Sequence, residues 1–296
     1  MTGLRPPLGS ILNFRDVSEF VNEATHTRRL QTGLLYRCAR PAQDEASFQD
    51  RQRLIHDYKV KSIIDLRTKT EHIEQARKQA ANIKASAALS QTNDAVAEPL
   101  KMPNIAYYNI NFNGSAFSRM LLSKLSWFEY IHLVGLMLLG YRLDAIKILS
   151  PHMEKMGLVG LAISSLDVCT YEVKQVFDVF AEEHNWPILV HCTQGKDRTG
   201  LVVMLVLFLL GVDEQAIDLD YRSSEAELAS EKEARMKEIQ SIGLSERFAL
   251  CPSDVVKSVH AHLLEEYGGV CNYLAKIGVT TETIDIIKRK LLVDAQ

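Results

Sequence analysis

Four short apolar runs along the chain have the length of buried strands. They lie near residues 34–37, 60–66, 105–110 and 187–191. Runs of roughly four to eight residues that are bounded by polar or turn residues are typical of strands inside a sheet. Helix-length segments lie between and after them. This alternation predicts an α/β fold with a central, mostly parallel sheet flanked by helices.

Longer segments repeat their apolar residues at helical spacing. The clearest covers residues 170–184, where Val173, Val176, Phe177 and Phe180 mark one buried stripe. Further segments with helical patterns cover residues 43–57, 115–157, 200–210, 213–221, 224–240, 255–267 and 280–292. We expect the helix over 224–240, rich in Glu, Lys, Ala and Arg, to be solvated, and residues 268–274 to separate the last two helices.

Residues 115–157 contain more helix than a simple crossover between strands needs. Within them, residues 127–139 are apolar enough to require a partner surface. Residues 76–103, which are rich in Ala, Lys, Gln and Asn with weak periodicity, are expected to form a solvent-facing connection. No internal repeat or Pro/Gly/Ser-rich linker divides the chain. We therefore expect one domain, residues 1–296, with a helical insertion at 115–157.

Composition removes several classes of function. The net charge is −3 and no basic stripe is present, so we expect no nucleic-acid partner. The first residues lack the apolar core of a signal peptide, and no stretch reaches the roughly 18 apolar residues of a membrane span. These features predict a soluble, cytoplasmic protein. The five cysteines are dispersed and form no C-x-x-C pair, which argues against a disulfide framework and against a metal site.

The most informative stretch is HCTQGKDRTG, residues 191–200, between the last apolar run and an apolar helix. Five residues separate Cys192 from Arg198, enough for one turn of chain to surround a tetrahedral anion with backbone N–H groups at a helix N-terminus. These dipoles and the guanidinium of Arg198 favour the thiolate of Cys192. Arg198 can hold two phosphoryl oxygens, and Asp197 can donate a proton to a leaving oxygen.

This loop resembles the signature of the cysteine-dependent protein tyrosine phosphatases. Its Gly195-Lys196-Asp197 is similar to the atypical bacterial and fungal branch of tyrosine and dual-specificity phosphatases, which also act on phosphoinositides. Further similar elements are NFRD at residues 13–16, LYR at 35–37, IIDLR with a following Glu at 63–71, I-x-x-D-Y at 217–221 and GG-x-x-x-YL at 268–274. The resemblance implies the cysteine-phosphatase fold.

The resemblance also implies roles for individual residues. Cys192 is the expected nucleophile, Arg198 the phosphate clamp and Asp197 the general acid. We expect the remaining loop positions to bind phosphate: Thr193, Gln194, Gly195, Lys196 and Thr199. His191, Asp65, Arg15 and Asp16 are expected to support the site, and a paired structural network is the favoured role of Arg15 and Asp16 because charges near a core need partners.

Three assignments stay open at this point. Asp167, upstream of the loop, is the alternative to Asp197 as general acid. Lys196 is either a second cation of the pocket, which would favour phosphoinositides, or a loop-stabilising partner of Asp197. Cys38, where the family usually has a small hydroxyl residue, is either a buried core residue or a redox partner of Cys192.

The sequence thus predicts a phosphomonoester hydrolase that works through a phosphocysteine intermediate without cofactor or metal. Its expected substrate is a phosphotyrosine-containing protein or a phosphoinositide. A sulfurtransferase and a catalytically idle phosphate-binding module are the alternatives. The family commonly carries paired helices as a mobile lid over the phosphate pocket, and residues 115–157 fit either such a lid or a fixed helical layer.

Overall fold

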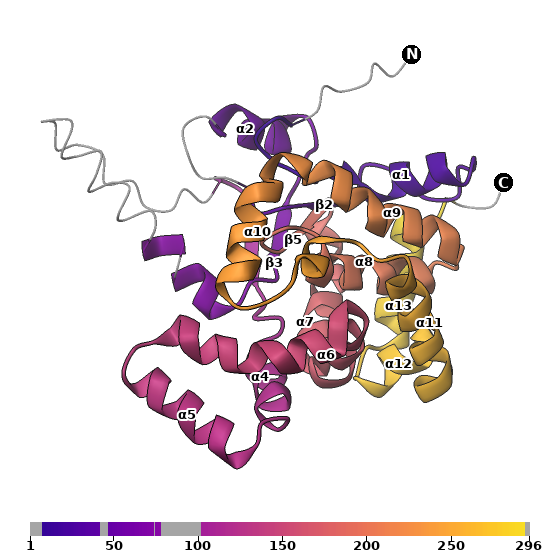
Figure 1. Cartoon of the computed structure of the whole chain (residues 1–296). Coiled ribbons are helices and arrows are strands. Elements are labelled where there is room, and N and C mark those ends of the chain that lie inside the picture. The colour runs from indigo at the N-terminus through magenta and orange to yellow at the C-terminus, as the bar shows by residue number, and fades with distance from the viewer. Residues whose placement is uncertain (1–7, 42–46, 74, 78–101, 294–296) are drawn as a thin grey trace, which may run out of the picture.

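The computed structural model describes residues 8–41, 47–73, 75–77 and 102–293 (Figure 1). Their centre is a five-stranded sheet with strand order β1-β2-β5-β3-β4. All pairs are parallel except the edge pair of β1 and β2. The prediction of an α/β fold with a mostly parallel sheet is therefore confirmed. The strands are β1 (Arg15–Asp16), β2 (Leu35–Cys38), β3 (Ser62–Asp65), β4 (Ala106–Asn109) and β5 (Ile188–His191).

Strand β5 lies between β2 and β3 and is buried on both faces. Ile188, Leu189 and Val190 are completely inaccessible to solvent. Successive side chains of a strand point to opposite faces. Ile188 and Val190 accordingly belong to the larger core, and Leu189 to a smaller one on the other face. An uninterrupted apolar run is what a central parallel strand requires.

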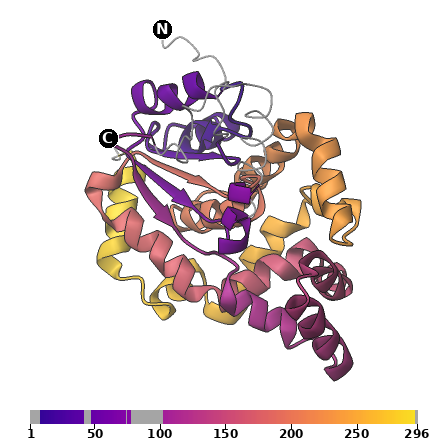
Figure 2. The same ribbon diagram turned by 90° about the vertical axis from the view of Figure 1, so that its left-hand side faces the viewer.

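Helices cover both faces of this sheet. The smaller core contains Leu54 of α2 (Phe48–His56) and Ile11 from the N-terminal segment. Figure 2 shows the sheet between these indigo segments and the salmon and yellow helices on the opposite side. The helices that contribute to the larger core include α1 (Val17–Ala24), α7 (Thr170–Ala181), α8 (Asp197–Leu209), α9 (Glu214–Glu227), α11 (Asp254–Tyr267), α12 (Val270–Lys276) and α13 (Thr281–Leu291).

Helix α8 begins directly after the loop that follows β5. Its residues from Thr199 to Leu207 are all buried, so the helix is apolar on every side and cannot slide or rotate without losing packing. The first turn of α8 is therefore held in a fixed place relative to the sheet. This turn carries Asp197 and Arg198.

The predicted helical segment at 115–157 is helical and extends further. It contains α4 (Ser115–Leu122), α5 (Trp127–Leu138) and α6 (Arg142–Val168). Gly157, with φ of 64°, interrupts the helical backbone of α6. Helix α5 packs against α6 and extends away from the sheet, at the lower left of Figure 1.

Two predictions about local structure were wrong. Residues 268–274, expected to separate two helices, contain the start of α12, because Gly268 and Gly269 make the turn in only two residues. The solvated helix expected over 224–240 is divided: α9 ends at Glu227 and α10 (Lys232–Ser241) follows a short 3₁₀ turn, with Ile239 buried.

Most of the connection expected over 76–103 lies outside the described residues. No single helix in the described ranges is long and apolar enough to cross a membrane. The helical segments Asp144–Val168 and Thr170–Ala181 reach that length and apolar content only when they are taken together, and the chain bends by 74° between them.

Candidate active site

The loop between β5 and α8 rests on the backbone at the end of β2. Gly195 has a φ of 64°, and a Cβ atom placed on it would lie 2.0 Å from the carbonyl oxygen of Cys38. Any larger residue would therefore push the loop off β2. The backbone N–H of Arg40 donates to the carbonyl of Thr193 at 3.1 Å, which joins the two segments on the other side of the contact.

Side chains from two other elements hold the carbonyl oxygens of the loop. The Asn13 amide donates to the carbonyls of Gln194 at 3.0 Å and Gly195 at 3.1 Å. Arg37, completely buried in β2, donates to the same Gly195 carbonyl at 2.7 Å. With the carbonyls turned outward and bonded, the loop can direct its N–H groups inward, as an anion site requires.

Asp220 of α9 joins this network from beneath. Its carboxylate pairs with Arg15 at 2.7 Å and with Arg37. Burial alone would raise the pKa of Asp220, but Arg37 and Arg15 lower it below the usual range. Sequence reasoning did not select Asp220 as a site residue, although it is the aspartate of the I-x-x-D-Y element.

Arg15 and Asp16, expected in one paired network, have separate roles in the structure. Arg15 pairs with Asp220 instead. Asp16 is the N-cap of α1, where it accepts hydrogen bonds from the backbone of Ser18 at 2.9 Å and Glu19 at 3.1 Å. Burial raises the pKa of Asp16 to about 6. Adjacent strand residues point to opposite faces, and this separates the two side chains.

Arg198 is clamped by Glu71. Its Nη1 and Nη2 donate to the two carboxylate oxygens of Glu71 at 2.6 and 2.7 Å, and Nη1 also donates to the Leu66 carbonyl at 3.1 Å. Burial would raise the pKa of Glu71, but these hydrogen bonds lower it to about 2. Burial would likewise lower the pKa of Arg198, while Glu71 and Cys192 raise it overall.

The same Glu71 also closes a capping box at the start of a helix. It accepts from the backbone N–H of Thr68 at 2.8 Å, and its own N–H donates to the Thr68 hydroxyl at 3.3 Å. The sequence motif predicted this capping box. It gave no signal that the carboxylate would also orient Arg198, because 127 positions separate the two residues.

His191 and Asp65 meet at the carboxyl ends of β5 and β3. The His191 Nε2 lies 3.7 Å from Asp65 Oδ2, and its Nδ1 lies 3.1 Å from the carbonyl of Cys192. Asp65 pairs with Arg67, whose Nε donates to Asp65 Oδ1 at 2.9 Å. Burial lowers the pKa of His191, although Asp65 opposes the shift. The pair fits a scaffold beside the loop.

The side chain of Lys196 does not act as a cation of the pocket. It is completely buried, and its Nζ donates to the carbonyls of Phe248 at 3.1 Å and Leu250 at 2.6 Å. Nζ also lies 3.2 Å from Asp197 Oδ1. Of the two expectations for Lys196, the geometry therefore favours the loop-stabilising one.

The two candidate acids are in different surroundings. Asp197 lines the cavity over the loop, with half of its side chain exposed, and accepts a hydrogen bond from Tyr221 at 3.3 Å. Asp167, near the end of α6, instead contacts His262 and Tyr267, both at 2.7 Å. The resemblance favoured Asp197 and left Asp167 as the alternative; of these two aspartates, the fold brings Asp197 to the loop and places Asp167 against α11.

A cavity of about 720 Å³ opens over the loop. Cys192, Asp197 and Arg198 are among the residues that line it. Its walls come mainly from α4, α6, α8 and α10 and are largely apolar; they include Phe117, Leu121, Leu149, Met153, Leu158, Leu161, Ile239 and Phe248. The helical segment after β4 therefore forms part of the site.

The sequence profile of the tyrosine phosphatase family matches residues 6–293. The chain belongs to this family. It is 32% identical over 134 residues to a tyrosine-protein phosphatase of Nostoc commune, an alignment that covers 40% of this chain and 44% of that protein. It is 35% identical over 127 residues to the triple specificity protein phosphatase PtpB of Mycobacterium tuberculosis, which covers 36% and 44%. The alignments thus span less than half of these curated relatives.

Two further residues near Cys192 are buried, one at the end of β2 and one in the first turn of α8. Cys38 is completely buried, and burial raises the pKa of its thiol, as expected for a core residue. The hydroxyl of Thr199 is buried and has no hydrogen-bond partner among the described residues. Among all the residues that the structure describes, no group of three or more His, Cys, Asp or Glu side chains could hold a metal ion.

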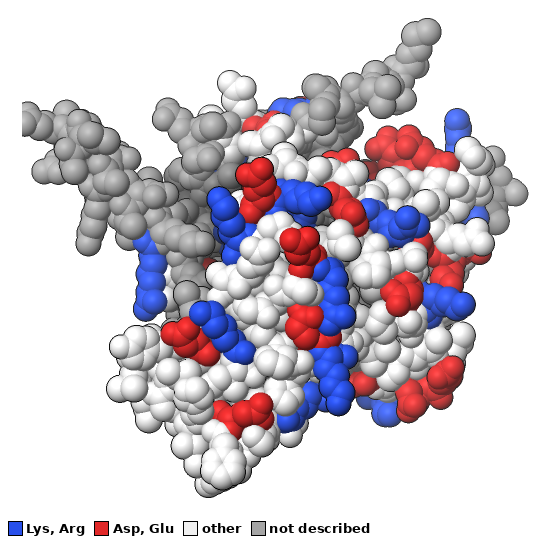
Figure 3. Space-filling model, in the orientation of Figure 1, with Lys and Arg blue, Asp and Glu red and all other residues white. Residues whose placement is uncertain are grey.

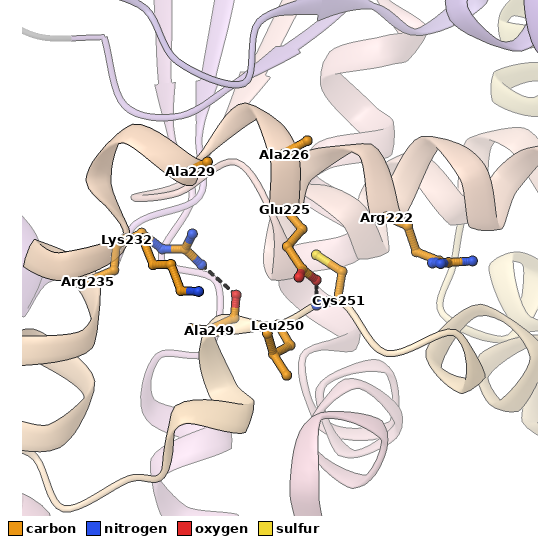
Figure 4. Close-up of a pocket in the computed structure, with 9 residues that line it drawn as sticks. All are labelled: Arg222, Glu225, Ala226, Ala229, Lys232, Arg235, Ala249, Leu250 and Cys251. Carbon is orange, nitrogen blue, oxygen red and sulfur yellow. Dashed lines mark hydrogen bonds between the residues drawn. The ribbon is translucent and has the colours of Figure 1, made fainter.

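A second cavity, of about 440 Å³, lies behind the segment that Lys196 contacts (Figure 4). Arg235 of α10 donates to the Ala249 carbonyl at 2.8 Å, and Glu225 accepts from the Cys251 N–H at 2.9 Å. Residues 248–251 are thus held from the loop on one side and from α9 and α10 on the other. This connects the wall of the main cavity to the loop.

Proposed function

We propose that this chain is a phosphatase that hydrolyses phosphotyrosine in proteins through a phosphocysteine intermediate, with no cofactor or metal. We further propose that it acts as one domain in which residues 115–157 cover the site. The observation that carries the proposal is the guanidinium of Arg198. Of its five N–H donors, three are bonded to Glu71 and Leu66. The Nε–H and one Nη2–H have no partner among the described residues, and they lie on one edge.

Two free donors on one edge match two oxygens of a phosphoryl group. With the loop N–H groups, they would hold the three equatorial oxygens while the Cys192 sulfur attacks phosphorus in line. The S–P bond forms as the bond from phosphorus to the alcohol oxygen breaks, and Asp197 gives its proton to that oxygen.

The second step returns the enzyme to its starting state. Water attacks phosphorus, Asp197 takes a proton from it, and the S–P bond breaks to release inorganic phosphate. Thr199 supports the departing thiolate, because its buried hydroxyl is free to donate. Glu71 keeps Arg198 in place throughout, and His191 positions the strand end from which Cys192 projects.

The walls of the cavity favour an aryl phosphate. Phe117, Leu149 and Met153 offer an apolar surface to a phenyl ring above the loop. A preference for phosphoinositides was expected only if Lys196 added a charge to the pocket, and its Nζ is bonded to protein carbonyls instead. Phosphotyrosine is therefore the favoured substrate, and activity on phosphoserine, phosphothreonine or phosphoinositides is the broader alternative.

The direct test is hydrolysis of p-nitrophenyl phosphate, with a chelator present. Cys192→Ser should abolish turnover and Arg198→Lys should reduce it by about 100-fold or more, because a lysine offers no fork of donors. Cys271→Ser, at an exposed cysteine, is the matched control and should be unaffected. Full turnover by Cys192→Ser would refute the mechanism. Thiosulfate:cyanide turnover without phosphatase activity would identify a sulfurtransferase, and binding without turnover an idle module.

The role of Asp197 is tested by the leaving group. Asp197→Asn should slow alkyl phosphates far more than aryl phosphates, because a phenolate leaves with little help from an acid. Asp167→Asn is the control and should leave both rates unchanged. A selective loss in Asp167→Asn would move the acid upstream.

A further inference from the structure

Helix α5 exposes an unusual amount of apolar surface. Leu133 is its only buried residue. Phe128 and Leu138 are 82% and 83% exposed, and Trp127 and Leu139 are 70% and 73% exposed. Figure 3 shows this corner, at the lower left, as mostly white with few charged side chains. Such clusters on proteins that remain free in water are normally small, and larger ones mark interaction sites.

The exposed apolar residues occupy more than one side of the helix. At 3.6 residues per turn, the arc from Met137 through Trp127 to Leu139 covers roughly 200° of the circumference. No charged side chain lies within this arc, because Glu129 and His132 both fall outside it. A helix that docks on one protein face needs an apolar stripe of only about 100°. One protein partner would therefore leave part of the arc in water.

The opposite side of α5 is already occupied by α6. Leu133 is buried there, and Glu129 Oε1 lies 3.2 Å from His152 Nε2. Glu129 also closes a capping box with Ser126 at the start of the helix. The one acidic residue of α5 is thus fixed at the inner side, which keeps the helix in place and leaves the apolar arc pointing outward.

We propose that α5 inserts into the surface of a lipid bilayer. The hydrocarbon of a bilayer surrounds an inserted helix, so it can cover the whole apolar arc of α5. A single protein face would cover only part of it. The helix has 12 residues, or about 18 Å at 1.5 Å per residue, too short for the roughly 30 Å hydrocarbon core. It therefore lies along the interface. Trp127, Tyr130 and Tyr141 supply the aromatic groups suited to that depth.

Charge near the helix agrees with this occupant. Arg119 and Lys124, both exposed, precede α5, and no acidic residue lies between Arg119 and Glu129. Cations close to an inserted helix can contact the phosphates of the lipid headgroups. Because α4 and α6 also line the main cavity, insertion of α5 would hold the cavity close to the membrane surface.

The two tryptophans make the insertion measurable. Trp127 is 70% exposed on α5, whereas Trp186 is 3% exposed in the core. Vesicles of phosphatidylcholine and phosphatidylserine should shift the tryptophan emission of the full chain to shorter wavelength, and lipids brominated in their chains should quench it. Trp127→Phe should abolish both signals while the protein still floats with the vesicles.

Flotation of variants tests the helix itself. Phe128→Glu combined with Leu138→Glu should lower the fraction bound to vesicles by at least about ten-fold, because two side chains would no longer enter hydrocarbon. Leu219→Glu, on α9 and 49% exposed, is the matched control and should bind as the unmodified chain does. An unchanged melting temperature of the double variant shows that folding is preserved. Equal flotation of the double variant, or no flotation of the unmodified chain together with a stable dimer in solution, would overturn the proposal.

Discussion

The two sides of the loop at residues 192–196 are built on different physical principles. Beneath it, Asn13, Arg37 and Asp220 form a buried polar network in which charges pair with charges or with loop carbonyls. Above it, the walls of the cavity are mainly apolar helices, and one of them, α6, carries the exposed helix α5.

The polar network beneath the loop fixes one geometry, whereas the apolar walls above it can adapt to different ligands. A buried charge is costly unless each partner is in place, so the network beneath the loop has one arrangement. Apolar walls impose no such directional requirement, and side chains can repack around ligands of different shape. We therefore expect substitutions beneath the loop to affect folding, and substitutions in the cover to affect binding and motion.

Removing Asp220 should have the largest effect. Asp220→Ala leaves the buried Arg37 and the partly buried Arg15 without their carboxylate, and we expect a loss of about 3–5 kcal/mol in the free energy of unfolding. Denaturant unfolding measures this. Asp178→Ala, which breaks an exposed pair with Lys174, is the control, with an expected loss below about 1 kcal/mol. Similar losses in both variants would remove the distinction between the network and ordinary surface pairs.

The pairing of Glu71 with Arg198 should appear in the pH dependence of stability. The pKa of Glu71 is lowered from 4.5 to about 2 in the folded chain. Its stabilisation is therefore complete above pH 4.5 and is lost as the pH falls toward 2. Glu71→Gln should cost on the order of 2 kcal/mol at neutral pH, and the difference from the unmodified chain should shrink through this range. Parallel stability curves would contradict the proposed pairing.

Lys196 tests the boundary between the two sides. Lys196→Met leaves the carbonyls of Phe248 and Leu250 without a donor, and we expect a loss of about 1–3 kcal/mol. Because Nζ does not face the cavity, turnover of phosphotyrosine peptide and phosphoinositide should fall by the same factor. A selective loss of turnover on the lipid would show that the charge of Lys196 does reach the substrate.

The smallest effect is expected in residues 115–157, which we propose cover the site, and it is an effect on their mobility. Amide hydrogen exchange should be faster over residues 115–157 than in β5 and α8, and should slow when vanadate occupies the loop. Uniform protection with no response to vanadate would indicate a fixed helical layer. Either result decides between the two expectations for this segment.

Local signals carried much of the correct prediction. The central strand, the loop and the buried helix follow one another within the 22 residues from 188 to 209, and each has its own pattern: an apolar run, a Cys-x5-Arg spacing and an apolar helix. Strand β1, with two residues, was missed because a pair of residues has no periodicity. The turn at Gly268 and Gly269 was placed correctly, but the start of α12 directly after it was not expected.

What the sequence by itself determined is the chemistry available at the loop: a cysteine, an arginine and an aspartate at spacings that suit an anion between a strand and a helix. Only the tertiary structure decided the use of each charge. Glu71 meets Arg198, Asp220 meets Arg37, and Lys196 meets the carbonyls of residues 248 and 250. These partners lie far apart in the chain, and side-chain charges pair according to distance in space. Two cations two positions apart in the sequence therefore acquire opposite surroundings, one at the cavity and one in the core.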